Sequence, residues 1–265
     1  MAQIYVAALE DIAEGLRRWR LWGRMGWGDI RRRYRRTVLG PFWTTLSMAI
    51  LVVSVGIVFA TLWKMDISVY LPFLCTGLIA WIPISTVLTE SCNALVSGES
   101  VLKQVRVPYS LFIYATVWRN LIVMAHHLVV YVVVARIFDV PVNMNTLLVV
   151  LGVAFFALNS MWIGLLLGMV CVRYRDLQAL VGTVLPIVML VTPIFWPPEL
   201  LAGSGRLALV DANVFYHVID VIRAPLLGKA PAMLSWIWVG GLAVFGWSIT
   251  FVLFSRFRSR LCYWL

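Results

Sequence analysis

Residues 29–43 read Asp29-Ile30-Arg31-Arg32-Arg33-Tyr34-Arg35-Arg36-Thr37-Val38-Leu39-Gly40-Pro41-Phe42-Trp43. The basic part of this segment leads directly into an apolar run that begins at Trp43 and ends at Trp63. A helix of about 20 residues, at about 1.5 Å per residue, spans the roughly 30 Å of hydrocarbon in a bilayer. Tryptophan at both ends of such a run is typical of the two membrane–water interfaces. The segment therefore predicts a basic, water-facing region followed by a transmembrane helix.

The remainder of the chain is apolar to the same degree. Of its 265 residues, 62% are hydrophobic and 13% are charged, and a soluble domain of this size could not bury so much apolar surface. Five further apolar blocks cover about 69–89, 109–135, 146–171, 177–196 and 234–254. The sequence predicts an all-α membrane protein, with one domain over 1–265 and six transmembrane helices within 43–254.

Two segments predict helices that do not cross the membrane. Residues 4–19 place apolar side chains on one helical face, so we expect 1–28 to form an amphipathic interface helix in the membrane surface, or alternatively one packed on a partner protein. Its apolar residues are Tyr5, Leu9, Ile12, Leu16 and Trp19. Residues 197–231 are too interrupted for a span, which predicts short re-entrant or interfacial helices between spans five and six. The interrupting residues are Gly203, Gly205, Pro225, Gly228 and Pro231.

Arg119 is the one Lys or Arg residue inside an apolar block. If the membrane portion of that block starts near Trp118, Arg119 lies at the inner interface. If the membrane portion starts earlier, Arg119 is deep and lines a polar cavity. Glu90, at the end of the second apolar block, is a possible partner in either arrangement.

Lys and Arg are distributed unevenly between the two expected sides. The terminal segments and the 90–108 and 172–176 loops carry sixteen of them, whereas the opposite side carries five. Those five are Lys64, Arg136, Arg206, Arg223 and Lys229. This bias predicts that both termini, including a 255–265 tail, are cytoplasmic. The same placement explains the net charge of +10 without a nucleic-acid partner.

Motifs for catalysis or cofactor binding are missing from the sequence. It contains no GxxxxGK[ST] phosphate-binding loop and no HExxH zinc motif, and its four cysteines form no CxxC pair. His126 and His127 are adjacent, so a helix would point them about 100° apart, and they are expected to serve packing. On the outer side, Asp220 and Arg223 predict a surface ion pair. We therefore expect neither an enzyme nor a bound cofactor or metal.

The 93–107 loop predicts a short cytoplasmic helix. Glu99 and Lys103 stand four residues apart, and Val101, Leu102 and Val105 supply an apolar face. Such a helix either docks into a groove on a partner or is a solvated linker, and the residues alone leave both alternatives open.

Several motifs, in this order, resemble the ABC-2-type permeases that export polysaccharides. They are the 29–43 segment, the loop that ends Val105-Arg106-Val107-Pro108, the turn Arg173-Tyr174-Arg175-Asp176-Leu177, the run Pro193-Ile194-Phe195-Trp196-Pro197, and Asn213 ahead of an outer segment. The resemblance extends over essentially the whole chain. It points in particular to permeases of O-antigen exporters, with capsule and teichoic-acid permeases as related groups.

The resemblance implies a homodimer in a bacterial inner membrane, joined to two cytoplasmic ATP-binding cassette subunits that hold ATP and Mg. The dimer would form a channel for a polysaccharide linked to a polyprenyl pyrophosphate. Residues 29–42 would form a cytoplasmic gate, 93–106 the coupling helix, and 197–231 the outer gate. An ABC-2 exporter of a drug or small lipid, and a membrane-bound glycan-processing enzyme with outer-face Asp211 and Asp220, are the alternatives.

The resemblance assigns residues to three expected sites. The entrance gate contains Arg31, Arg32, Tyr34, Arg35, Leu39, Gly40 and Trp43. The ATPase-coupling surface contains Glu99, Lys103, Arg106, Arg173 and Asp176. The outer gate contains Trp196, Pro197 and Asn213. Arginines near residue 31 could bind a pyrophosphate through charge-assisted hydrogen bonds, or could anchor the chain to anionic lipid, since both need the same charges.

Overall fold

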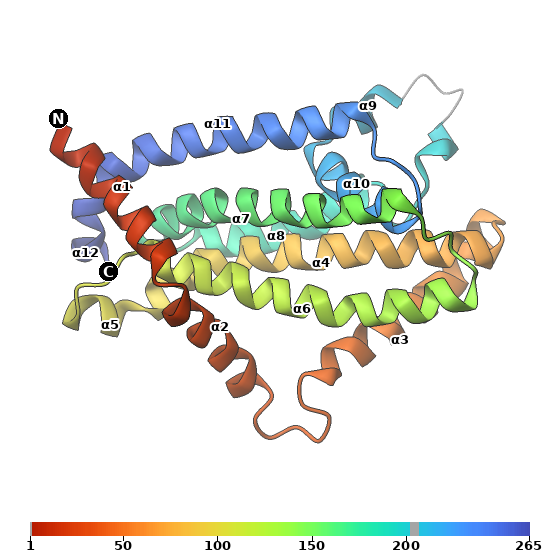
Figure 1. The fold of residues 1–265 in the computed structure, drawn as a ribbon, viewed down its shortest axis with the longest axis horizontal. Helices are drawn as coiled ribbons and strands as arrows, with labels where there is room; N and C mark the ends of the chain where they lie inside the picture. Colours follow the sequence, from red (N-terminus) through yellow and green to blue (C-terminus); the bar gives the residue numbers. More distant parts are fainter. Residues whose placement is uncertain (1, 202–206) are drawn as a thin grey trace.

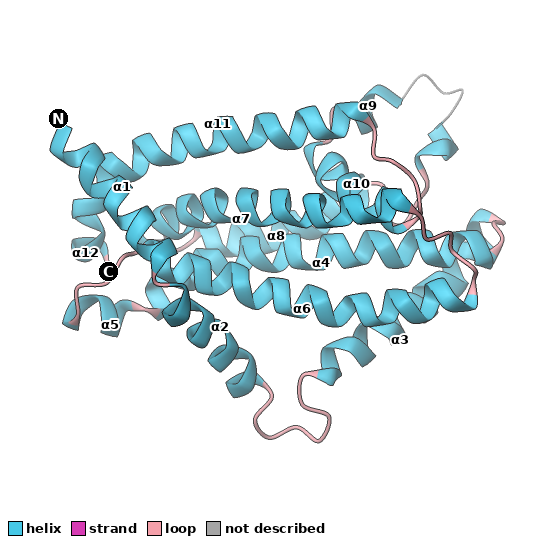
Figure 2. Cartoon of the chain, in the orientation of Figure 1, coloured by secondary structure: helices cyan, strands magenta, loops and turns pink. Residues whose placement is uncertain are grey.

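The computed structural model describes residues 2–201 and 207–265, and these residues form helices and loops without a strand (Figure 2). Five of the helices are long and apolar enough to cross a membrane. They are α3 (Phe42–Trp63), α4 (Ile67–Ser97), α6 (Ser110–Ile137), α7 (Leu148–Arg173) and α11 (Met233–Phe257). They lie side by side in one bundle (Figure 1). A helix satisfies its own backbone hydrogen bonds, which is why apolar sequences fold this way in lipid.

The fifth expected span, 177–196, is shorter in the structure. Its helix, α8, covers Leu177–Val191, and 15 residues reach only about 22 Å. The helix stops because Thr192 takes an extended conformation ahead of Pro193, and a proline disfavours a helical residue before it. The count of six spans therefore remains a prediction.

Helix α4 is the centre of the bundle. It packs against α3, α6, α7, α8 and α10, and most of its side chains between Tyr70 and Leu95 are buried. It runs to Ser97, well past the expected end of the second span at residue 89. The expected coupling helix over 93–106 is therefore wrong in its bounds, because only α5 (Glu99–Gln104) forms a separate helix there.

Both termini lie at one end of the bundle, which we call the basic end; it holds α1 (Ala2–Arg17), α2 (Trp19–Arg33), α5 and α12 (Leu261–Trp264) (Figure 1). The expected helix 1–28 is two helices that break at Arg18 and continue to Arg33. The start of the expected 29–42 gate is thus helical. The expected tail is folded as well, since Leu261 and Leu265 are buried in a cluster with Ala8 of α1.

The opposite end carries the short elements η1 (Met144–Leu147), η2 (Pro198–Leu201), α9 (Leu207–Asp211) and α10 (Val214–Leu226). Short helices were predicted here, but α10 is not a surface helix: it packs against α4, α7 and α11. Asn213 caps α10 by accepting hydrogen bonds from the backbone of Phe215 and Tyr216. Gly203, Gly205 and Arg206, which the sequence analysis named, lie outside the described residues.

Candidate functional site

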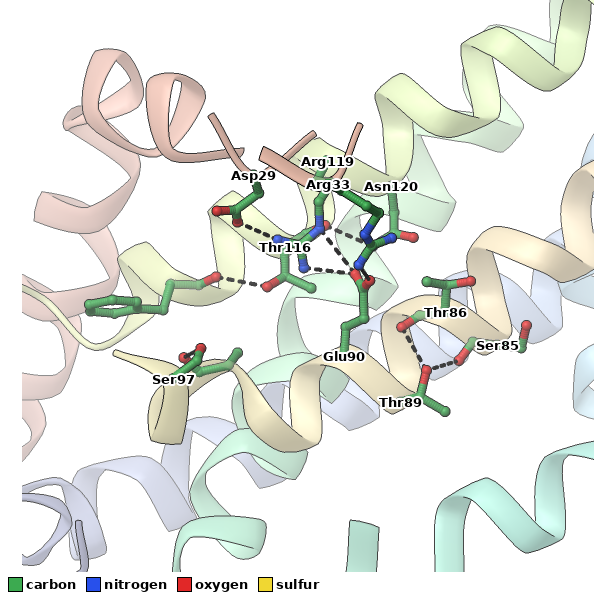
Figure 3. Close-up of polar contacts among 12 residues, drawn as sticks. Asp29, Arg33, Ser85, Thr86, Thr89, Glu90, Ser97, Thr116, Arg119 and Asn120 are labelled. Atoms are coloured by element: carbon green, nitrogen blue, oxygen red, sulfur yellow. Dashed lines mark hydrogen bonds and ion pairs between the residues drawn. The ribbon is translucent and has the colours of Figure 1, made fainter. Parts of the chain in front are cut away.

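A cluster of charged side chains joins three helices at the basic end (Figure 3). Its centre is Glu90 of α4. One carboxylate oxygen of Glu90 accepts a hydrogen bond of 2.7 Å from Arg33 of α2. The other accepts from Arg119 Nε at 3.1 Å and Nη2 at 2.7 Å, and from Asn120 at 3.0 Å. Four donors from α2 and α6 thus converge on one carboxylate, which explains how a charged group is tolerated between packed helices.

Arg119 links this carboxylate to a second one. Its Nη1 donates to Asp29 of α2, which also pairs with Arg32. The side chains of Arg119 and Glu90 are only 13% and 17% exposed. The predicted pairing of Arg119 with Glu90 is confirmed. The contact with α2 also places Arg119 at the basic end of the bundle.

The cluster carries a net positive charge. Arg32, Arg33 and Arg119 outnumber Asp29 and Glu90 by one. The hydrogen bond from Arg33 to Glu90 raises the pKa of Arg33 above its ordinary value, so this arginine stays cationic. The surplus charge makes the surrounding surface favourable for anions.

A cleft of about 310 Å³ opens beside the cluster, between α3, α4 and α6. Arg33, Glu90 and Arg119 line its charged part, and Trp43, which is 51% exposed, lines it at the start of α3. The remaining walls are of mixed polarity. They are Tyr34, Thr44, Ser47, Met48, Leu51, Ile82, Thr86, Asn120, Val123 and His127. The cleft therefore combines arginines, hydroxyl groups and an aromatic face.

The expected gate residues lie in and around a second hollow. Arg31, Arg32, Tyr34 and Arg35 line a space of about 860 Å³ under the loop after α2. Tyr34 lines both spaces, so they are neighbours. Arg31 and Arg35 form no ion pair within the described part of the chain, so both charges are free to meet a ligand or a lipid.

Leu39 and Gly40 lie in the same loop. Leu39 is 43% exposed, and Gly40 has a φ of +56°, a left-handed conformation that L side chains adopt only with strain. The glycine accordingly has a backbone role in the turn that leads into α3. Neither residue lines either of the two spaces.

The expected coupling residues lie on two adjoining elements of the basic end. On α5, Lys103 and Glu99 form an exposed ion pair of 2.6 Å. Val101 and Val105 of the predicted apolar face are exposed, whereas Leu102 packs against the core. Arg106 is exposed in the link that follows α5.

In the turn after α7, Arg173 stacks over Tyr174 at 5.3 Å and over Trp264 of α12 at 5.0 Å. Asp176 is the N-terminal flanking residue of α8, and its backbone carbonyl accepts from Ala179 and Leu180. The turn is thereby connected to the C-terminal helix.

Asp11 has a structural role that the sequence did not predict. Its side chain, fully buried on α1, accepts hydrogen bonds from the backbone N–H groups of Tyr109 and Ser110 at 3.2 and 3.1 Å and from Arg258 at 2.9 Å. It thus caps the start of α6 from a residue almost 100 positions away. The sequence contains no signal for this role, because adjacent residues of a helix point about 100° apart and Asp11 lies off the apolar face that contains Ile12.

At the opposite end, Trp196 donates to the carbonyl of Leu190 at 3.0 Å, and Asn213 donates to Thr192 at 3.1 Å. Pro197 is buried in the same turn. The predicted surface ion pair of Asp220 with Arg223 is wrong.

Arg223 is 4% exposed and donates to the carbonyl of Pro193. Asp220 instead accepts from Ser235 at 2.7 Å and from the backbone of Ala232 at 3.3 Å. Burial of α10 turned the arginine inward, away from its neighbour on the helix.

His127 is buried, in keeping with its expected packing role. Among the described residues, no group of three His, Cys, Asp or Glu side chains is arranged to hold a metal ion.

Comparison with known proteins shows which sequences this chain is similar to. The sequence model of the family described as "ABC-2 type transporter" matches residues 20–227, which is well over half of the chain. The chain is also 24% identical over 184 residues to the O-antigen export system permease protein RfbA of Myxococcus xanthus. The aligned part covers 69% of this chain and 71% of that relative.

Proposed function

Because this chain belongs to the ABC-2 type transporter family, we propose that it is the transmembrane subunit of an ATP-driven exporter of a lipid-linked polysaccharide. The cargo is O-antigen or a related glycan, moved from the cytoplasm across the bacterial inner membrane. The family and the five apolar helices make the chain a multi-pass membrane subunit whose ATPase resides on a partner. The similarity to an O-antigen export permease supports the glycan cargo.

The proposed assembly is a homodimer with two cytoplasmic ATP-binding subunits, and both termini are cytoplasmic. The basic end then faces the cytoplasm, in keeping with the excess of Lys and Arg there. Helix α8 crosses as a short sixth span that the 192–197 turn completes.

The observation that carries the cargo proposal is the pair of neighbouring spaces at the basic end. Arg31 and Arg35 have no ionic partner in the described residues, and they stand beside a cleft that Trp43 and several hydroxyl groups line. Guanidinium groups bind phosphate oxygens through paired hydrogen bonds, and aromatic faces stack on sugar rings. This combination suits a diphosphate joined to a sugar.

The ATPase partner would dock on α5 and on the turn after α7. Glu99, Lys103 and Arg106 present exposed charge there, and Val101 and Val105 present exposed apolar surface. Exposed apolar groups rimmed by charges are typical of a protein interface.

The experiment that tests the assembly is affinity purification of the tagged protein from native membranes, with an ATPase assay. We expect a stoichiometric ATP-binding subunit whose activity in the complex is lost on Glu99→Arg. Glu10→Arg, the same change at an exposed glutamate of α1, is the control and should keep the activity. A protein that purifies alone would contradict the exporter and return attention to a glycan-processing enzyme.

The cargo is tested in cells that lack the protein. Complementation with the parent chain should restore the surface glycan, and the Arg31→Glu, Arg35→Glu double variant should leave lipid-linked glycan inside. The Arg136→Glu, Lys229→Glu double variant, at two exposed basic residues of the opposite end, is the charge-matched control. Unchanged surface glycan in the deleted strain, together with a bound ATPase, would identify an exporter of a drug or small lipid instead.

A further inference from the structure

The turn between α8 and η2, residues 192–197, is held from three sides. Trp63 of α3 and Tyr70 of α4 both donate to the carbonyl of Phe195. Asn213, ahead of α10, donates to Thr192. Ile194, in the middle of the turn, is fully buried. An irregular segment buried among helices must have its backbone groups satisfied by neighbours, and these side chains contribute to that.

Arg223 supplies the remaining contact and differs from the others because it is charged. Its Nη1 donates to the carbonyl of Pro193 at 2.7 Å, and its guanidinium lies 4.2 Å from the ring centre of Phe73 on α4. No carboxylate pairs with it among the described residues. Asp220, one turn earlier on α10, is engaged by Ser235.

A buried charge without a counter-charge does not improve a fold, because an apolar side chain of similar size would avoid the cost of desolvation. Two of its nitrogen atoms, Nε and Nη2, have no hydrogen-bond partner within the described residues. The guanidinium, which offers five N–H donors in a fixed plane, thus uses its Nη1 for the carbonyl of Pro193 and, in the part of the chain that the structure describes, leaves other donors unused.

We propose that Arg223 is a positioning residue that latches the 192–197 turn onto α4 and α10. On the proposed function, the outer end of the transport path opens when the turn moves and Arg223 releases the carbonyl of Pro193. The latch itself depends only on the contacts above. Among the described residues, Arg223 is the one charged side chain that forms a hydrogen bond with this turn.

The test measures how fast the turn becomes accessible. Ile194→Cys, in a chain that also carries Cys262→Ser, is labelled in intact cells with a membrane-impermeant maleimide. The other cysteines are buried, and the same chain without Ile194→Cys gives the background. Arg223→Met keeps the apolar stem and removes the donor, so we expect labelling about tenfold faster or more.

Two comparisons separate a donor role from a packing role. Arg223→Lys keeps a charged donor, so its labelling should rise by less than about threefold. Lys229→Met removes an exposed charge near the same helix and should change nothing. The proposal is overturned if Arg223→Met labels at the parent rate, or if the Lys and Met variants label equally fast.

Gly77→Ala is a second route to the same result if Arg223→Met does not reach the membrane. A Cβ at Gly77 would stand 2.1 Å from Arg223 Nη2, so the guanidinium must move while its charge remains. We expect faster labelling of Ile194→Cys here too, with Gly182→Ala on α8, which meets no atom within 4 Å, as the control. Unchanged labelling in Gly77→Ala would also overturn the latch. Neither rate requires cargo or ATPase, so loss of the latch would leave the proposed function standing.

Discussion

Single carboxylates connect distant parts of this protein at the basic end. Glu90 accepts hydrogen bonds from α2 and α6, and Asp11 accepts them from the start of α6 and from Arg258 after α11. Both carboxylates are largely shielded from water, so the hydrogen bonds from these donors replace the hydration that each has lost. Replacement of either should cost far more than replacement of an exposed acid on the same elements.

Glu90→Gln should destabilise the protein by about 1–3 kcal/mol, because the amide loses the charge and turns an N–H group toward the arginines. Thermal unfolding in detergent measures the change. Glu99→Gln is the matched control, since that glutamate belongs to an exposed pair and should cost at most about 1 kcal/mol. Equal losses in the two variants would show that the Glu90 cluster adds no stability.

Asp11→Ala should cost about 2 kcal/mol or more, because the buried N–H of Ser110, the partly buried N–H of Tyr109 and Arg258 lose their acceptor. The same unfolding assay applies, with Glu10→Ala at the neighbouring exposed position as the control. Limited proteolysis should also cut the link after α5 sooner in Asp11→Ala. Parent-like stability together with parent-like proteolysis would count against this cap.

At the scale of the elements, glycines allow the helices of the bundle to approach closely. A Cβ at Gly152 of α7 would stand 2.3 Å from the carbonyl oxygen of Val221 on α10, and one at Gly246 of α11 would stand 2.1 Å from the ring of Trp162. The first neighbour is backbone and cannot turn aside. Helix α10 can therefore pack this closely against α7 only because Gly152 has no side chain.

Gly152→Ala should destabilise the protein by about 1–3 kcal/mol, because α10 must move outward as a unit. Gly182→Ala, on α8, meets no atom within 4 Å and should be neutral or more stable by up to about 1 kcal/mol, since alanine favours a helix. Unfolding in detergent compares the two. Similar behaviour of the two variants would contradict the close contact between α7 and α10.

At the scale of the whole molecule, the two ends have different chemistry. The basic end combines free arginines with the charged cluster, and the opposite end is held by hydrogen bonds to backbone carbonyls. On the proposed function, the basic end faces the cytoplasm.

The orientation predicts which single cysteines react with an impermeant maleimide. Met144→Cys, 82% exposed between α6 and α7, should react in intact cells. Val105→Cys, after α5, should react only after permeabilisation. Tyr174→Cys and Glu199→Cys lie before and after α8. If this short helix crosses the membrane, Tyr174→Cys should react only after permeabilisation and Glu199→Cys should react in intact cells. Labelling of positions 174 and 199 from the same side would show that it does not cross.

Part of the candidate site could be predicted from the sequence. Glu90 and Arg119 stood out because they are charged residues beside or within apolar blocks, and their pairing followed from that. Asp29 and Asn120 were missed, since nothing local distinguishes an aspartate near a basic run or an asparagine in an apolar helix. Arg223 was misplaced because spacing along one helix cannot tell which side of that helix a neighbour covers.

The sequence by itself determined that lipid surrounds most of the chain, that the fold is helical, and where the basic residues concentrate. Its apolar runs have bilayer length, and in lipid only a helix or a closed barrel satisfies the backbone. The tertiary structure alone decided where α4 and α8 end, and which polar groups meet. Helix periodicity reports one face of one helix, whereas Glu90 is neutralised by residues 29 and 57 positions away, and Arg223 finds its acceptor 30 positions away. Those contacts exist only when the helices have packed.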